Sequence, residues 1–237
     1  MGKWKIIFGL GILGLLVFTL LFLWSRSWSN SLFMRPLDHL ESPDKVIALT
    51  FDDGPSLVKT SKLLELLEAY QVKATFFMLG SKISLHPEIA QRVYQKGHLI
   101  GNHTYSHLRM IFKMPQEMIQ EITLTDELIK KTGQKDVAFF RPPYTSKFII
   151  LPLVLNYLNK TLVTGSYDPP AEYKSPINPI LVSQQILENS KSGSIIYLHD
   201  GDDRDMDNFL SAVEMTIQGL IKQGYKFVRI DQNPNQI

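Results

Sequence analysis

Short apolar runs alternate with longer amphipathic segments along most of the chain. Each apolar run is consistent with a strand of a parallel sheet, which is buried on both faces and therefore continuously hydrophobic. The runs are 46–51, 74–79, 98–101, 138–140, 161–164, 194–198 and 226–230. The segments between them have apolar residues at helical spacing, and glycine or proline marks several of their ends. These segments are 57–70, 87–96, 115–131, 147–159, 177–191 and 207–223.

This alternation of strand and helix predicts an α/β fold. Consecutive strands joined by helices pair in parallel, so we expect one sheet of about seven parallel strands. The simplest arrangement closes that sheet into a barrel, and an open doubly wound sheet is the alternative.

The N-terminal segment has a different pattern. Residues 6–24 are nineteen consecutive residues without a charge. As a helix they extend about 28 Å at about 1.5 Å per residue, close to the thickness of the hydrocarbon core of a bilayer. We therefore expect a transmembrane signal anchor at 6–24 behind a short cytoplasmic tail at 1–5. Two lysines in the tail favour this orientation, although Arg26 and Arg35 weaken the charge contrast.

The remainder of the chain is then outside the cell, held at the cell membrane by a single span. Residues 25–43 are polar and predict a stalk, and residues 44–237 predict one catalytic domain. A cleaved signal peptide is the alternative, because small residues in 25–29 have the spacing of a cleavage site. The apolar region of a signal peptide is usually shorter, about 7 to 15 residues.

Composition narrows the classes of function. With 237 residues, 44% hydrophobic and 20% charged, the chain is globular and long enough for one large core. A net charge of +2 and the lack of a basic run give no reason to expect a nucleic-acid partner. There are no cysteines, which excludes disulfides, thiolate zinc sites and thiol catalysis, so any metal must be bound by His, Asp or Glu. We expect a monomer.

Polar residues follow several of the predicted strands. In parallel α/β folds the working site lies at the carboxyl ends of the strands. The stretches found there are Asp52 and Asp53 in LTFDDGPS, NHTYSH at 102–107, RPPY at 141–144, SYD at 166–168 and HD at 199–200. We expect these side chains to meet at one mouth of the sheet.

The pair Asp52 and Asp53 has two explanations. Asp-Asp-Gly-Pro is a favourable turn sequence, and taken alone it needs no other role. Beside a metal, however, one carboxylate can bind the cation while its neighbour, directed elsewhere by strand alternation, acts as a base. The cation also offsets the repulsion between the two charges.

His103 and His107 are candidate metal ligands. Residues four apart on a helical turn lie on one face, so their imidazole nitrogens can converge on one ion. The H-x-x-x-H spacing is by itself also common among ordinary histidines. Two imidazoles and one carboxylate form a ligand set that leaves coordination positions open, as a catalytic zinc needs.

Four of these motifs together resemble a known family. TFDDGP, HTYSH, RPPY and YLHD, in this order and at these separations, look like the polysaccharide deacetylases of carbohydrate esterase family 4. The similarity covers about residues 44–231. It implies a distorted (β/α) barrel and a divalent-metal N-deacetylase that acts on chitin or peptidoglycan.

The resemblance also implies a role for each matching residue. Asp53, His103 and His107 would bind the metal, and Asp52 would be the general base, oriented by Arg141. The backbone N–H of Tyr144 would help to hold the oxyanion, His199 would be the general acid, and Leu198 would line the acetyl pocket.

The chain departs from the family pattern at two places. Thr145 follows Tyr144, where the family usually has Gly. The fourth motif usually reads Asp-x-x-Asp-Trp; Asp168 matches its first Asp, whereas Glu172 and Tyr173 can replace Asp-Trp only with one extra residue between. We expect Asp168 to be catalytic and Tyr173 to line the substrate pocket, but the sequence leaves the orienting partner of His199 open. Without a carboxylate partner, the pKa of His199 would fall and weaken it as an acid.

We therefore expect a membrane-anchored, extracellular N-deacetylase of N-acetylglucosamine-containing polysaccharide. Bacterial peptidoglycan is the substrate that we favour. Chitooligosaccharides and exopolysaccharides remain open as substrates. The expected metal is zinc, and cobalt, nickel or manganese would fit the same ligands. The altered fourth motif also leaves open a membrane-tethered glycan-binding protein that keeps the metal site and has lost turnover.

Overall fold

The computed structural model describes residues 2–25 and 27–232. Residue 1 of the predicted tail, residue 26 of the predicted stalk and residues 233–237 of the predicted domain lie outside the described residues. The helices are α1 (Gly2–Ser25), α2 (Lys59–Ala69), α3 (Gly80–Leu85), α4 (Pro87–Gln95), α5 (Pro115–Lys131), α6 (Ile150–Tyr157), α7 (Pro179–Asn189) and α8 (Met206–Lys222). The strands are β1 (Val46–Asp52), β2 (Thr75–Met78), β3 (Leu99–Asn102), β4 (Phe139–Phe140), β5 (Thr161–Leu162), β6 (Ser194–His199) and β7 (Lys226–Phe227). Two 3-10 turns, η1 (Pro143–Thr145) and η2 (Pro170–Tyr173), follow β4 and β5.

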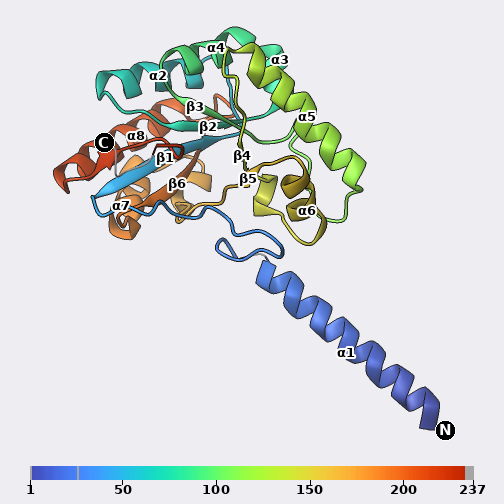
Figure 1. Ribbon diagram of the computed structural model, residues 1–237. Coiled ribbons are helices and arrows are strands. Elements are labelled where there is room, and N and C mark those ends of the chain that lie inside the picture. The colour runs from blue at the N-terminus through green and yellow to red at the C-terminus, as the bar shows by residue number, and fades with distance from the viewer. Residues whose placement is uncertain (1, 26, 233–237) are drawn as a thin grey trace.

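The seven strands form one parallel sheet in the order β5-β4-β3-β2-β1-β6, and β7 pairs with the start of β1. All seven residues of β1 are buried, which explains why this strand is a continuous apolar run. The sheet curls, and helices surround its outer side (Figure 1). Isolated bridges between Leu37 and Val163, His39 and Ser194, and Tyr167 and Ile196 connect the β5 side to β6. The predicted barrel-like fold is therefore confirmed.

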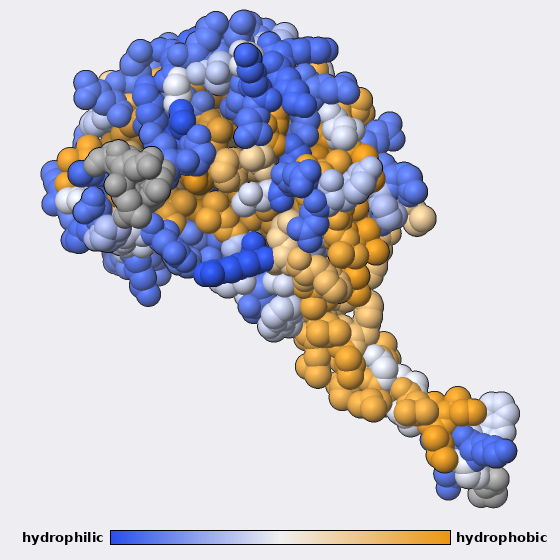
Figure 2. Space-filling view, in the orientation of Figure 1, coloured by the Kyte–Doolittle hydropathy of each residue, from blue (hydrophilic) through white to orange (hydrophobic). Residues whose placement is uncertain are grey.

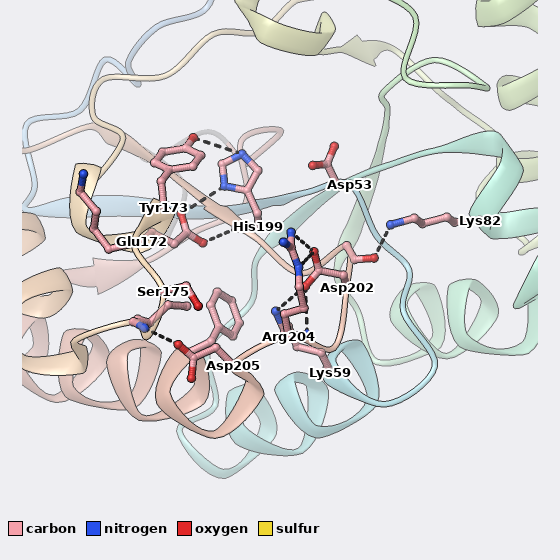
Figure 3. Close-up of a pocket in the computed structure, with 14 residues that line it drawn as sticks. Asp53, Lys59, Lys82, Glu172, Tyr173, Ser175, His199, Asp202, Arg204 and Asp205 are labelled. Carbon is pink, nitrogen blue, oxygen red and sulfur yellow. Dashed lines mark hydrogen bonds and ion pairs between the residues drawn. The ribbon is translucent and has the colours of Figure 1, made fainter.

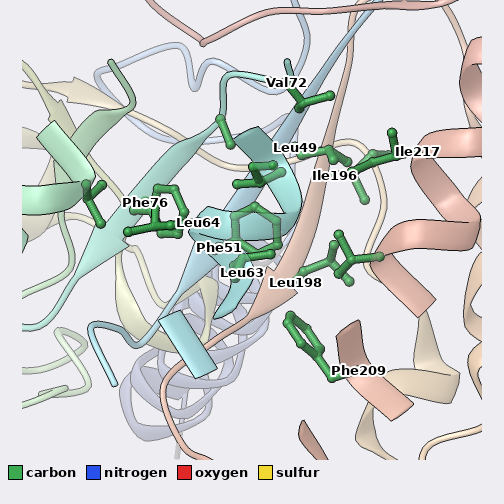
Figure 4. Packing of buried hydrophobic residues seen from close by; sticks show 14 of the residues in the cluster. Leu49, Phe51, Leu63, Leu64, Val72, Phe76, Ile196, Leu198, Phe209 and Ile217 are labelled. Carbon is green, nitrogen blue, oxygen red and sulfur yellow. The ribbon is translucent and has the colours of Figure 1, made fainter. Parts of the chain in front are cut away.

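A hydrophobic core lies between the sheet and the helices that cover it. Phe51 and Phe76 on neighbouring strands pack with their ring centroids 5.1 Å apart, and Phe209 of α8 contacts Phe51 edge to face (Figure 4). Leu63 and Leu64 of α2 are fully buried against them. Burying each such side chain stabilises the fold by roughly 1.5 to 3 kcal/mol, and this packing fixes the strand ends that carry the site.

The short helix α3 was not predicted. It has six residues directly after β2, too few for a helical repeat of apolar residues to show in the sequence. Three predicted strands are also shorter than expected: β4, β5 and β7 have two residues each.

The segment predicted as a stalk contacts the domain in the structure. Described residues between 27 and 40 pack on the domain: Lys147 Nζ donates to the carbonyl oxygen of Ser27 at 2.8 Å, and Leu37 N–H donates to that of Leu162 at 2.8 Å. Leu40 is 6% exposed. The burial of Leu40 and these hydrogen bonds connect the segment to the folded domain before residue 44.

The N-terminal helix α1 projects from the domain (Figure 1). It is long and apolar enough to cross a membrane, and the apolar window within it is exposed. Its hydrophobic surface stands out in the space-filling view (Figure 2). This agrees with the helix expected at 6–24, and its length and composition do not distinguish an anchor from a signal sequence.

Candidate active site

Asp53, His103 and His107 converge at the carboxyl end of the sheet. Asp53 Oδ1 lies 3.3 Å from His103 Nε2 and 3.1 Å from His107 Nε2, and the three ligand atoms lie within 4.8 Å of one another. These three residues are a candidate metal site, which we call the metal centre. Burial alone would raise the pKa of Asp53, but the two neighbouring histidines, when protonated, lower it well below its usual value, so the carboxyl is ionised.

The hydrogen bond of His103 indicates that the metal centre suits a cation. His103 Nδ1 lies 2.7 Å from the carbonyl oxygen of Arg141, which can only accept, so Nδ1 carries the proton. In the neutral ring, Nε2 then directs its lone pair at Asp53 Oδ1, a buried oxygen left without a hydrogen-bond partner among the described residues. Lone pairs that face one another across about 3 Å are stabilised by a cation between them.

The two histidines do not converge by the mechanism that the spacing predicted. Residues 103–107 form no helical turn; the backbone is irregular, with φ of 72° at Thr104 and 64° at His107. Asp53 also has a positive φ of 70°. Non-glycine residues in this conformation are strained, and such strain concentrates at functional sites.

Asp52 lies beside the metal centre but has another partner. Its Oδ1 accepts from Arg141 Nη1 at 2.6 Å, and its Oδ2 lies 4.0 Å from His103 Nε2. Arg141 Nη1 also donates to Thr50 Oγ1 at 2.7 Å. The sequence reasoning missed Thr50, although strand alternation in LTFDD places it on the same side as Asp52. The adjacent carboxylates therefore have separate environments.

Arg141 is buried and held by stacking and hydrogen bonds. It is 1% exposed, and its guanidinium lies between the rings of Phe77 and Tyr197, 4.0 and 3.8 Å from their centroids. Cation–π stacking favours such a guanidinium, and the adjacent charge of Asp52 balances it. The side chain is thereby held rigidly against Asp52.

Glu172 is the partner of His199 that the sequence left open. Glu172 Oε2 lies 3.1 Å from His199 Nδ1, and Glu172 Oε1 accepts from the backbone N–H of His199 at 2.7 Å (Figure 3). Burial alone would lower the pKa of His199, but the Glu172 charge and hydrogen bond raise it to about 10. The pKa is therefore raised, and the fall considered for a histidine without a carboxylate partner does not apply.

Asp168 and Tyr173 meet on the other side of His199. Tyr173 Oη donates to Asp168 Oδ2 at 2.8 Å and lies 3.5 Å from His199 Nε2. Asp168 thus reaches His199 through Tyr173. Tyr173 is 61% exposed, as a substrate-facing residue would be.

Of two further predicted site residues, Tyr144 lies at the metal centre and Leu198 lies in the hydrophobic core. Tyr144 lies against the metal centre: its ring centroid is 4.6 Å from that of His107, and the Arg109 guanidinium lies 4.1 Å from it. Leu198 is 1% exposed and packs in the hydrophobic core near Phe209 (Figure 4). Strand alternation directs it away from the mouth into which the neighbouring His199 points.

A cavity of about 270 Å³ opens between Asp53 and His199 (Figure 3). Tyr173 and Glu172 line one side of it, and the cationic side chains of Lys59, Lys82 and Arg204 line the other. A ligand in this cavity would contact Asp53 and His199 at the same time.

Comparison with known proteins gives consistent matches. The family model described as polysaccharide deacetylase matches residues 39–163. A peptidoglycan-N-acetylglucosamine deacetylase of Bacillus cereus is 32% identical over 80% of this chain and 88% of its own length. A bifunctional xylanase/deacetylase of Pseudobutyrivibrio xylanivorans is 35% identical over 81% of this chain, which corresponds to only 32% of that protein.

Solved structures agree. A crystal structure of the Bc1960 peptidoglycan N-acetylglucosamine deacetylase, in complex with 4-naphthalen-1-yl-N-oxidanyl-benzamide, superposes with a TM-score of 0.75 at 32% identity. It covers 81% of this chain and 89% of that one.

Proposed function

The chain belongs to the polysaccharide deacetylase family, and we propose that it hydrolyses the N-acetyl groups of N-acetylglucosamine in bacterial peptidoglycan. The proposal rests on one observation: the two adjacent carboxylates have different partners. Asp53 faces two imidazoles, and Asp52 is held by Arg141. Relatives named as peptidoglycan deacetylases support the choice of polymer.

The metal centre would hold one divalent cation, and zinc suits two imidazoles and a carboxylate. Cobalt, nickel and manganese fit the same ligands, and availability decides among them. When bound, the cation polarises the acetyl carbonyl and lowers the pKa of a water molecule.

The remaining steps belong to the side chains. Asp52, oriented by Arg141, takes the proton of the attacking water as general base. The N–H of Tyr144 would stabilise the oxyanion, a contact worth roughly 3 to 4 kcal/mol. His199, kept protonated by Glu172, gives its proton to the departing amine, and acetate and a free amino sugar leave.

We also propose that α1 anchors a monomer in the cell membrane with the catalytic domain outside. The uncharged run and the lysines of the tail support this orientation. A bacterial cell-wall polymer lies on the same side of the membrane.

The test combines metal content with acetate release for the full chain in detergent. We expect wild type to hold about one metal and to deacetylate peptidoglycan or N-acetylglucosamine oligomers. Asp53→Ala should lose the metal, whereas Asp52→Asn should keep it and stop releasing acetate. A wild-type protein that holds its metal but deacetylates no glycan would instead support the glycan-binding alternative.

A further inference from the structure

One face of the domain is apolar where α1 joins it. The hydrophobic surface of α1 continues onto the domain (Figure 2). Exposed side chains contribute to this face from the loop before α5, from α6 and from the 27–40 segment; they are Phe33 (62%), Phe112 (71%), Met114 (68%), Leu153 (45%) and Tyr157 (76%). We call these five residues the apolar face. Large exposed apolar patches mark a partner or a membrane.

The parts of the apolar face belong together. Phe112 contacts Phe148, which precedes α6, at a centroid distance of 6.4 Å. Asn156 Nδ2 of α6 donates to the carbonyl oxygen of Phe33 at 3.1 Å. Phe33 and Phe112 have φ of 67° and 59°, an unfavourable conformation for bulky side chains that the surrounding structure holds in place.

The helix α1 contacts the same region. The Phe18 ring lies 5.3 Å from that of Phe148, and the Phe22 ring lies 5.6 Å from Phe148 and 6.3 Å from Phe112. Ser25 Oγ donates to the carbonyl oxygen of Lys147 at 3.3 Å. The last turns of α1 are therefore packed against the domain.

These contacts set the depth of the domain relative to a membrane. The uncharged run ends at Trp24, and Phe18 lies six residues earlier, about 9 Å along a helix. A bilayer that encloses this run reaches the level of Phe148 and Phe112. Elements that lie in a membrane interface are buried by about 5 to 10 Å, which matches this depth.

We propose that the apolar face docks the catalytic domain into the outer leaflet of the bilayer that α1 crosses; this rests on the membrane anchoring proposed above. Tyr157 suits the interface, because tyrosine presents an apolar ring and a polar tip. The domain is then a membrane-seated enzyme and not one on a flexible tether.

Docking would hold the active site close to the membrane. His107 of the metal centre is five residues from Phe112, and at about 3.6 Å per residue their separation is at most about 18 Å. Tyr144 is four residues from Phe148, at most about 14 Å by the same measure. The accessible substrate is therefore N-acetylated glycan at the outer surface of the membrane.

The chain has no cysteine, so single-cysteine variants can report the depth of chosen residues. Phe112→Cys and Tyr157→Cys test the apolar face. Leu85→Cys is the matched control, since Leu85 is also 71% exposed and ends α3, at the opposite end of the domain from α1 (Figure 1). The full chain, carrying a nitroxide or fluorescent label, is reconstituted in phosphatidylcholine–phosphatidylglycerol vesicles.

We expect quenchers attached to lipid chains to act several-fold more strongly than water-soluble quenchers on labels at 112 and 157, and the reverse at 85. Equal exposure to water at all three positions would overturn the docking. In the full chain labelled at 157, Phe112→Ser combined with Leu153→Ser should increase the exposure of the label to water, whereas Leu85→Ser should not.

Two control measurements distinguish the ways in which the proposals can fail. Resistance of the protein to carbonate extraction reports insertion of α1, and extraction by carbonate would refute the anchor and the docking together. Acetate release from a soluble N-acetylglucosamine oligomer reports the proposed activity in the same vesicles. An active protein with water-exposed labels refutes docking alone, and an inactive protein with the expected quenching refutes the deacetylase function alone.

Discussion

Glu172→Gln removes the negative charge beside His199 while keeping the shape of the side chain. The Gln carbonyl oxygen can still accept from the backbone N–H of His199, which Glu172 Oε1 does at 2.7 Å. Its amide group would then face Nδ1, which lies 3.1 Å from Glu172 Oε2. Because an amide N–H can only donate, Nδ1 must accept, and the imidazolium loses its stabilising partner.

The size of the effect follows from the pKa of His199. Glu172, with smaller contributions from Asp52 and Asp53, raises this pKa to about 10 from an ordinary value of 6.5, against the effect of burial. A return to about 6.5 is a change of about three pH units, or about 4 kcal/mol at 1.36 kcal/mol per unit. At pH 8.5 only about 1% of His199 would remain protonated in the variant, so kcat/KM should fall about 100-fold. At pH 5.5 about nine-tenths stays protonated, and the loss should be small.

The raised pKa of His199 also makes the stability of the fold depend on pH. A group with a raised pKa stabilises the folded state fully below its unfolded value of about 6.5, and this contribution is lost as pH rises through about 10. The difference in the free energy of unfolding between wild type and Glu172→Gln should therefore be largest below about pH 6.5, as long as Glu172 stays ionised, and should shrink toward pH 10.

The assay is the pH dependence of kcat/KM for acetate release from a soluble N-acetylglucosamine oligomer, with both proteins loaded with the same metal. Glu172→Asp is the matched control, because it keeps the charge and should keep the alkaline limb near that of wild type even if the rate falls. An alkaline limb that stays in place in Glu172→Gln would refute the assignment of this limb to His199.

Further substitutions test the supporting structure. Arg141→Met leaves Asp52 buried and unpaired, which should cost about 3 to 5 kcal/mol in the free energy of unfolding measured by urea denaturation. Gly101→Ala places a Cβ 2.4 Å from the Phe77 ring, and thermal denaturation should show a loss of about 1 to 3 kcal/mol. Tyr173→Phe removes an exposed hydrogen bond to the partly buried Asp168 carboxyl and should lower stability by only about 0.5 to 1.5 kcal/mol in the same assay, with kcat largely retained. Chelation should abolish acetate release, and added zinc should restore it; activity that survives complete metal removal would refute the metal-dependent mechanism.

The sequence by itself determined the parallel α/β sheet and which side chains gather at its carboxyl end. Apolar runs buried on both faces identify parallel strands, and the carboxyl ends of parallel strands meet at one edge. Asp52 and His199 end such strands and Asp53 and His103 come directly after them, so their proximity follows from local pattern and topology.

Only the tertiary structure decided the partners of these side chains. The contact of Glu172 with His199 depends on the path of the turn after β5, which the extra residue after Asp168 concealed. The convergence of His103 and His107 depends on an irregular backbone with positive φ and not on the helical turn that their spacing indicated. The packing of residues 27–40 and of α1 on the domain also joins segments more than 100 residues apart. Periodicity reports what each segment buries, but the identity of the contacting surface is set by long-range packing, which no local pattern encodes.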